Sequence, residues 1–204
     1  MLNDINGLTL GPSVVSGNLT VTAGGPIGQS GPITVTTPGS FASFSAPGNT
    51  ITLNDANNDF VTALFNGSDV SVNDVNALGL GSSTISGNFN VGAGGPISQS
   101  GTLLVNGAGK SATFRSPGNT ITLTDPNNDF TSVKLTGSDV NLTDVNSLDL
   151  GAANISGNLM VLAGGFHVMR GEFHSLIPVT VLGCLFAFIA YGRFKLKPIQ
   201  SKNA

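Results

Sequence analysis

The stretch LGPSVVSGNLTVTAGG (residues 10–25) returns as LGSSTISGNFNVGAGG (80–95) and again as LGAANISGNLMVLAGG (150–165). The spacing between successive copies is constant. The similarity extends beyond these copies: residues 2–71 align without a gap to residues 72–141, with 39 identities in 70 positions. Self-similarity of this length and regularity indicates that each 70-residue repeat is one structural module.

Apolar residues inside each module alternate with polar ones, and turn-forming Gly, Pro, Asn and Asp separate the alternating pairs. This pattern predicts short, half-buried strands. The clearest pairs in the first module are Leu19/Val21, Ile33/Val35, Ile51/Leu53, Val70/Val72 and Leu78/Leu80. No apolar residues recur at helical spacing over residues 1–165, so the repeat region is expected to be all-β.

The spacing of the expected strands indicates how they stack. Strands are expected to start near positions 18, 32, 50, 70 and 88, and such spacing favours coils stacked along one axis. We therefore expect a right-handed parallel β-helix of about four coils per 70-residue repeat, with a sandwich or propeller as the alternatives. The Ser-Gly-Asn triplets ending at Asn18, Asn88 and Asn158 are predicted to lie at corners, and the Ala-Gly-Gly clusters to serve corners that need a positive φ.

The sequence predicts two parts. The repeat region covers 1–165 and ends in a partial module, 142–165; a tail, 166–204, follows. Ten Asp against three Lys or Arg give the repeat region a charge of −7, whereas the tail carries +4. An acidic body without a basic stripe lacks the electrostatic footprint of a nucleic-acid-binding protein. The only cysteine, Cys184, lies in the tail, so the repeat region holds no disulfide.

The tail contains an uncharged run, LIPVTVLGCLFAFIAYG (176–192). Its length is at the short limit for a transmembrane helix. Because Arg193, Lys195 and Lys197 follow at once, the positive-inside rule predicts a membrane anchor with a cytoplasmic C-terminus and the repeats outside. The alternative is an apolar stretch produced by a frameshift or recombination, without a membrane role.

Two acidic segments resemble the start of a calcium-binding loop, D-x-N-x-D. The six weak calcium candidates are Asp55, Asn57, Asp59, Asp125, Asn127 and Asp129. The rest of the loop pattern is missing, because Phe60 and Phe130 stand where the loop needs Gly. An Asx turn joining two coils is the competing interpretation.

Candidate catalytic residues are scarce. The only histidines, His167 and His174, lie in the tail. Repeat-equivalent carboxylates such as Asp55 and Asp125 are expected about four coils, or roughly 19 Å, apart, whereas paired glycosidase carboxylates lie about 5–9.5 Å apart. A pair within one module, Asp55 with Asp59, stays open. We therefore expect no enzyme, no catalytic residue and no cofactor.

The string LGLGSSTISGNFNVGAGGPISQSG (78–101) resembles repeats of filamentous-haemagglutinin-like adhesins, which are large bacterial exoproteins exported by two-partner secretion. The resemblance covers about 1–165. It implies a parallel β-helical shaft segment that displays or mediates cell adhesion, located at the cell surface, secreted or in the outer membrane. The implied partners are host or surface glycans and proteins. Open helix ends predict self-association.

The chain departs from that family in two places. No signal peptide precedes the first repeat, and the repeat pattern stops after Gly165, where FHVMRG replaces the expected P-I-x-Q-S-G. Because of these departures, one alternative is that the chain is a truncated gene remnant without a function. A carbohydrate-active β-helix enzyme is the other.

Overall fold

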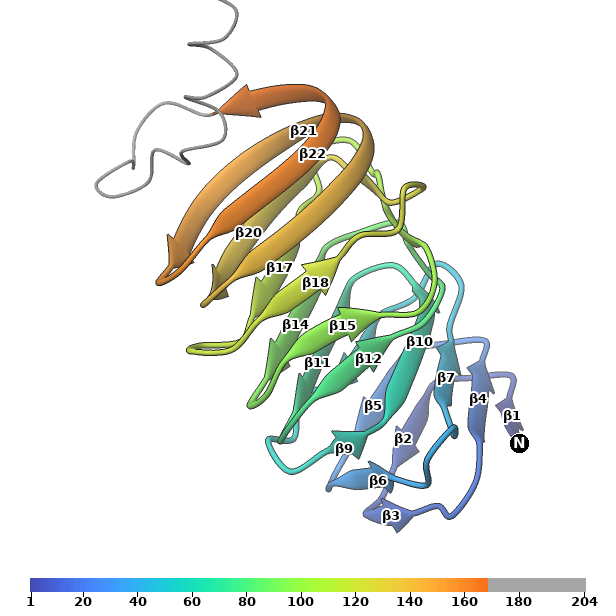
Figure 1. Ribbon diagram of the computed structural model, residues 1–204. Coiled ribbons are helices and arrows are strands. Elements are labelled where there is room, and N and C mark those ends of the chain that lie inside the picture. Colours follow the sequence, from blue (N-terminus) through green and yellow to red (C-terminus); the bar gives the residue numbers. More distant parts are fainter. Residues whose placement is uncertain (169–204) are drawn as a thin grey trace, which may run out of the picture. The chain divides into compact units, whose positions relative to one another are not determined.

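The computed structural model describes residues 1–168, and side chains as far as residue 164. These residues form an all-β solenoid in which every strand pairing is parallel (Figure 1). No helix occurs among them, and none of the described residues provides a helix long and apolar enough to cross a membrane. The apolar helix and transmembrane span expected over 176–192 lie outside the described residues.

The strands are short in the first two modules and longer at the end of the described chain. Their bounds are β1 Leu2–Asp4, β2 Leu8–Leu10, β3 Ser13–Val14, β4 Leu19–Ala23, β5 Ile27–Gln29, β6 Ile33–Val35, β7 Ala42–Ser45, β8 Ile51–Leu53, β9 Asp59–Phe60, β10 Thr62–Gly67, β11 Val70–Asp74, β12 Leu78–Leu80, β13 Ser83–Ile85, β14 Phe89–Ala93, β15 Ile97–Gln99, β16 Leu103–Val105, β17 Ala112–Arg115, β18 Ile121–Leu123, β19 Asp129–Phe130, β20 Ser132–Gly137, β21 Val140–Ile155 and β22 Leu159–Val168.

Successive turns stack with defined register. In the first two modules most strands pair with the strand three places later, as β1 does with β4 and β2 with β5, whereas β10 pairs with both β12 and β13. A turn therefore contributes about three strands, and the turns form three ladders. One ladder joins nine positions: Leu8, Ile27, Ile51, Val70, Phe89, Ala112, Val133, Leu150 and Val168. The described chain thus makes about nine turns, which confirms the predicted parallel β-solenoid.

The 70-residue repeat does not correspond to a whole number of turns. Ten strands, β1 to β10, fill the first repeat, and β11 to β20 fill the second. With three strands per turn, one repeat advances three turns and one further strand, between three and four turns instead of a full four. Leu8 and its equivalent Leu78 therefore lie in different ladders, Leu8 pairing with Ile27 and Leu78 with Ile97. Repeat-equivalent residues consequently lie on different walls of the solenoid.

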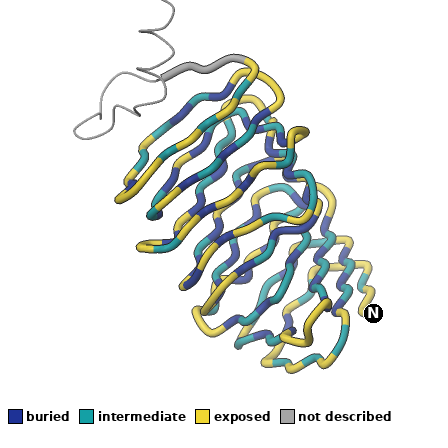
Figure 2. The backbone as a smooth tube through the Cα atoms, viewed as in Figure 1, coloured by how far each residue is buried: buried dark blue, intermediate teal, exposed yellow. Residues whose placement is uncertain are grey.

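The core is a continuous apolar column between the walls. From β4 to β20, alternate residues of most strands are buried, as the alternating colours of Figure 2 show. Six phenylalanines contact one another in the order Phe60, Phe44, Phe65, Phe89, Phe114 and Phe130, with ring centroids 5.8–5.9 Å apart. Phe44 and Phe65 belong to one ladder, Phe89 and Phe114 to the next. The aromatic column thus follows the rotation of the repeat.

Glycines are required for two different reasons. Gly48 and Gly118 adopt φ values of 74° and 73° in the turns that follow Pro47 and Pro117. The Ala-Gly-Gly clusters do not have a positive φ, so that expectation is wrong. A Cβ at Gly24 would instead collide with the carbonyl oxygen of Ile5 in the preceding turn. Close approach of two turns explains these glycines.

Candidate functional site

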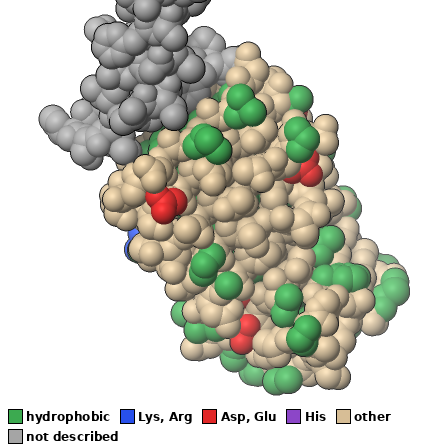
Figure 3. All heavy atoms as spheres, in the orientation of Figure 1, with side chains coloured by type: hydrophobic (Ala, Val, Ile, Leu, Met, Phe, Trp, Pro, Cys, Tyr) green, Lys and Arg blue, Asp and Glu red, His purple; other side chains and the backbone are tan. Residues whose placement is uncertain are grey.

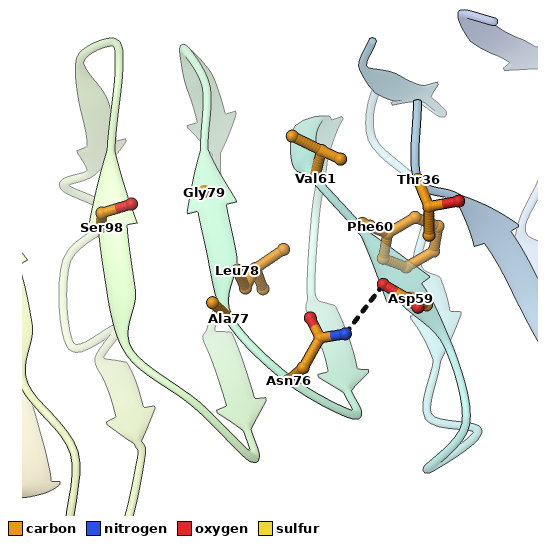
Figure 4. A pocket seen from close by; sticks show the side chains of 9 residues that line it. All are labelled: Thr36, Asp59, Phe60, Val61, Asn76, Ala77, Leu78, Gly79 and Ser98. Atoms are coloured by element: carbon orange, nitrogen blue, oxygen red, sulfur yellow. Dashed lines mark hydrogen bonds between the residues drawn. The ribbon is translucent and has the colours of Figure 1, made fainter. Parts of the chain in front are cut away.

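A hollow of ≈ 490 Å³ lies at the corner between β9 and β12 (Figure 4). We call it the Asp59 hollow. Asp59 from β9 and Asn76, just before β12, face each other across it, and the Asn76 Nδ2 donates a hydrogen bond of 3.1 Å to Asp59 Oδ1. Its lining consists of Thr36, Asp59, Phe60, Val61, Asn76, Ala77, Leu78, Gly79 and Ser98. None of these lining residues is a cation or a thiol.

A buried carboxylate holds the two sides of the hollow together. Asp74, 4% exposed, accepts hydrogen bonds from the Phe60 N–H (2.7 Å) and the Asn76 N–H (3.0 Å). Burial raises the pKa of Asp74 to about 6 from its ordinary 3.8, and the negative charge of Asp59 adds to the rise, while the two backbone hydrogen bonds oppose it. Asp74 therefore fixes the position of the backbone at Asn76 and at Phe60, the residue after Asp59.

A second buried polar group, Asn58, directly precedes β9. The Asn58 side chain is 0% exposed, and its Oδ1 accepts hydrogen bonds from the Ile33 N–H (2.9 Å) and the Gln29 Nε2 (2.8 Å). Its Nδ2 donates to Gln29 Oε1, to the Leu53 carbonyl and to the Asn73 carbonyl. The Asn58 amide thus joins three successive turns, and each of its polar atoms has a partner, as burial demands.

The second module repeats this arrangement, and its Asp129 accepts one further hydrogen bond. Asp144, with its pKa raised by burial, accepts hydrogen bonds from the Phe130 and Asn146 N–H groups. Asn146 Nδ2 donates to Asp129 Oδ1 (3.0 Å), as Asn76 does to Asp59. In addition, Asn106 Nδ2 donates to Asp129 Oδ2 (2.8 Å). Thr36 occupies the equivalent position in the first module and makes no such bond among the described residues.

The comparisons with known proteins place the repeats in a family. The family model described as Repeats of unknown function (DUF5649) matches residues 1–65 and again 67–136, more than half of the chain. The chain belongs to this family. No curated protein matches the chain, and no solved structure matches it. Two successive matches agree with the two modules seen in the sequence.

The sequence-predicted calcium candidates of the DUF5649 repeats make hydrogen bonds within the protein. Asp55 Oδ1 accepts hydrogen bonds from the backbone N–H and side-chain amide of Asn57, which is an Asx turn. Asp59 instead pairs with Asn76 from the next turn. Asp125, Asn127 and Asp129 repeat these contacts. Among the residues whose side chains the structure describes, no three His, Cys, Asp or Glu side chains converge into a group that could hold a metal ion.

Several site residues of the DUF5649 repeats were not predicted from the sequence. Asp74 and Asn58 belong to them, as do their equivalents Asp144 and Asn128 and the glutamines that pair with the asparagines, Gln29 and Gln99. The available signal was identity between modules: polar residues that recur at the same module position, within apolar strands and at their ends. The predicted corner asparagines are confirmed, since Asn18, Asn88 and Asn158 each directly precede a strand.

Proposed function

We propose that the chain is a structural shaft segment of a bacterial surface or secreted adhesin. The observation that carries the proposal is the unbroken ladder of nine in-register segments from Leu8 to Val168. A stack of this kind makes a rod whose length grows in proportion to the number of repeats. The resemblance of residues 78–101 to filamentous-haemagglutinin-like repeats supplies the adhesin part of the proposal.

Two kinds of interaction hold the rod together. Backbone hydrogen bonds of three strands join each turn to the next, for example Leu8 N–H to the Pro26 carbonyl and Ser13 N–H to the Pro32 carbonyl, at 2.8 and 2.9 Å. The phenylalanine column adds apolar contacts along the axis. Separating two turns requires that all of these break together, which favours a stiff shaft.

The surface chemistry supports a role in display, without catalysis. Figure 3 shows a face made mainly of backbone and neutral polar atoms, with scattered acidic and apolar side chains. Asp55 and Asp125 follow β8 and β18, which belong to different ladders. Equivalent carboxylates are therefore distributed around the rod, whereas a glycosidase needs two of them in one cleft.

The proposal is tested in the bacterium that produces the chain. Protease added to intact cells is expected to cleave the repeat region, and loss of the gene is expected to reduce attachment of the cells to host surfaces. A matched variant lacking residues 72–141 keeps the repeat boundaries, so it is expected to be exported but to support less attachment than the full chain. Protection of the repeats in intact cells, or attachment unchanged by gene loss, would overturn the proposal.

A further inference from the structure

The Asp59 hollow contains a carboxylate oxygen that the described chain leaves unused. Asp59 Oδ1 accepts the hydrogen bond from Asn76 Nδ2 at 3.1 Å, whereas no hydrogen bond joins Asp59 Oδ2 to the described residues. The Asp59 side chain is half-buried and lines the hollow (Figure 4). Since each oxygen of an ionised carboxyl accepts hydrogen bonds, Oδ2 can accept one from a ligand in the hollow.

The second module shows which kind of group fits that oxygen. Asn106 stands at the position equivalent to Thr36, and its Nδ2 donates to Asp129 Oδ2 at 2.8 Å. The other oxygen of Asp129 accepts a bond from an asparagine, as the other oxygen of Asp59 does. An amide N–H is therefore the donor that the same carboxylate position accepts when the chain itself supplies the partner.

Apolar surface and free space lie beside this oxygen in the first module. Gly79, without a side chain, lies in register between Thr62 and Ser98 of the neighbouring turns. Three lining residues are apolar or lack a side chain, whereas their equivalents in the second module are polar: Val61, Ala77 and Gly79 against Thr131, Ser147 and Asp149. The first hollow thus accepts an apolar group next to an amide donor.

The remaining lining favours a neutral ligand with hydroxyl groups. Thr36 and Ser98 are exposed and lie on opposite sides of the hollow, and each hydroxyl can donate and accept a hydrogen bond (Figure 4). Asp59 is the one charged residue of the lining, so an anionic ligand would be repelled. The volume of ≈ 490 Å³ lies within the range of about 300–1,000 Å³ that small-molecule sites occupy.

We propose that the Asp59 hollow binds an N-acetylated sugar residue of a neutral glycan. The acetamido N–H donates to Asp59 Oδ2, as the Asn106 amide does to Asp129. The acetyl methyl group packs on Val61 and Ala77, and the ring hydroxyls form hydrogen bonds with Thr36 and Ser98. This site goes beyond the proposed shaft role, because it requires the folded repeats but not their export.

The test is a titration of the purified full chain with the methyl glycoside of N-acetylglucosamine, followed by saturation-transfer NMR. The glycoside is expected to bind, with the strongest transfer to its acetyl methyl protons. Methyl glucoside carries a hydroxyl in place of the acetamido group, so it loses the methyl contact and is expected to bind about tenfold more weakly.

A blocking variant and a matched control assign the binding to the hollow. Thr36→Asn introduces the amide that fills the equivalent place in the second module, and is expected to weaken binding by about tenfold or more. Thr20→Asn makes the same change on β4, outside the lining, and also introduces the residue of the second module, Asn90. It is expected to leave the affinity unchanged.

Three results would overturn the proposal: no binding of the acetylated glycoside, equal binding of methyl glucoside, or full affinity in Thr36→Asn. A fourth probe, N-acetylasparagine amide, presents the side chain of Asn106 without a sugar. If this probe binds in place of the glycoside and Thr36→Asn abolishes its binding, the hollow accepts an amide side chain of a protein, and the sugar assignment is wrong. Because the titration uses purified protein, its outcome is independent of the protease experiment in cells.

Discussion

The carboxylates of Asp59 and Asp129 occupy equivalent positions in the two modules but accept different numbers of amide hydrogen bonds. Asp129 receives amide hydrogen bonds on both carboxylate oxygens, from Asn106 and Asn146, whereas Asp59 receives one from Asn76. Beneath them, the buried groups are the same in both modules: Asn58 and Asn128 make equivalent bonds, as do Asp74 and Asp144. These buried polar groups are thus the same in both modules, whereas the hydrogen bonds to the exposed carboxylates Asp59 and Asp129 differ.

The aromatic column is expected to show the largest effects, and equal ones in both modules. Phe44→Ala and Phe114→Ala each remove a fully buried ring that contacts two others. Each change is expected to lower the free energy of unfolding by about 3–5 kcal/mol, measured by denaturant titration. A cost confined to one of the two variants would contradict the equal contribution expected of the two rings.

The buried asparagines come next. Asn58→Ala leaves the Ile33 N–H and the Leu53 carbonyl without their partner inside the core, and Asn128→Ala does the same to Leu103 and Leu123. Each is expected to lower the free energy of unfolding by about 3 kcal/mol. The control is Asn57→Ala, next to Asn58 but exposed, which is expected to cost less than about 1 kcal/mol. Similar costs at positions 57 and 58 would contradict the network.

The two buried aspartates predict a pH dependence. Because the pKa of Asp74 is raised to about 6 in the folded state, the folded chain binds more protons than the unfolded chain between about pH 4 and pH 6. This contribution to stability is present at low pH and is lost as the pH rises through 6. Asp144, whose pKa is also raised, contributes in the same direction.

The corresponding measurement is the free energy of unfolding from pH 4 to pH 7, with and without these carboxylates. The double variant Asp74→Asn and Asp144→Asn is expected to show a flatter profile across that range than the unmodified chain. A control variant, Asp69→Asn, leaves both buried carboxylates in place and is expected to keep the slope of the unmodified chain. An identical slope in the double variant would show that neither aspartate titrates in this range.

The smallest expected effect concerns the exposed hydrogen bond between Asn106 and Asp129. Thr36→Asn places in the first module the amide that Asn106 provides in the second, and is expected to raise the free energy of unfolding by at most about 1 kcal/mol. Asn106→Thr is expected to lower it by a similar amount. If both changes shift the free energy of unfolding in the same direction, the hydrogen bond of Asn106 to Asp129 does not account for the difference between the two modules at this position.

Strands and fold class could be predicted from the sequence because the alternation of apolar and polar residues indicates which side chains face inward. The pairs Ile33/Val35 and Ile51/Leu53 are buried as predicted. The length of each turn could not be predicted as well. The register offset is much shorter between Thr62 and Gly79 than between Thr34 and Asp59, because the corners differ in size. The rotation of one module relative to the next depends on the lengths of all the corners between them.

The candidate site was harder to predict than the fold. Asn57 and Asn58 are adjacent and chemically identical, yet one is exposed and the other is fully buried with five hydrogen bonds. The role of Asn58 depends on Ile33 and Gln29, which are distant in the sequence and come close only after the turns have stacked. A local motif such as D-x-N-x-D contains no information about such partners.

The central claim, that turns of unequal length stack in parallel register, is tested most directly by disulfide trapping. Asn90 and Thr113 are register partners on the outer side of successive turns, although β15 and β16 lie between them in the chain. In a Cys184→Ser background, Asn90→Cys with Thr113→Cys is expected to form a disulfide readily under mild oxidation, because neighbouring strands lie about 4.8 Å apart. Rapid cross-linking of Asn90→Cys to a cysteine at Gly107, the partner expected for four equal turns per repeat, with none at Thr113, would contradict the solenoid described above.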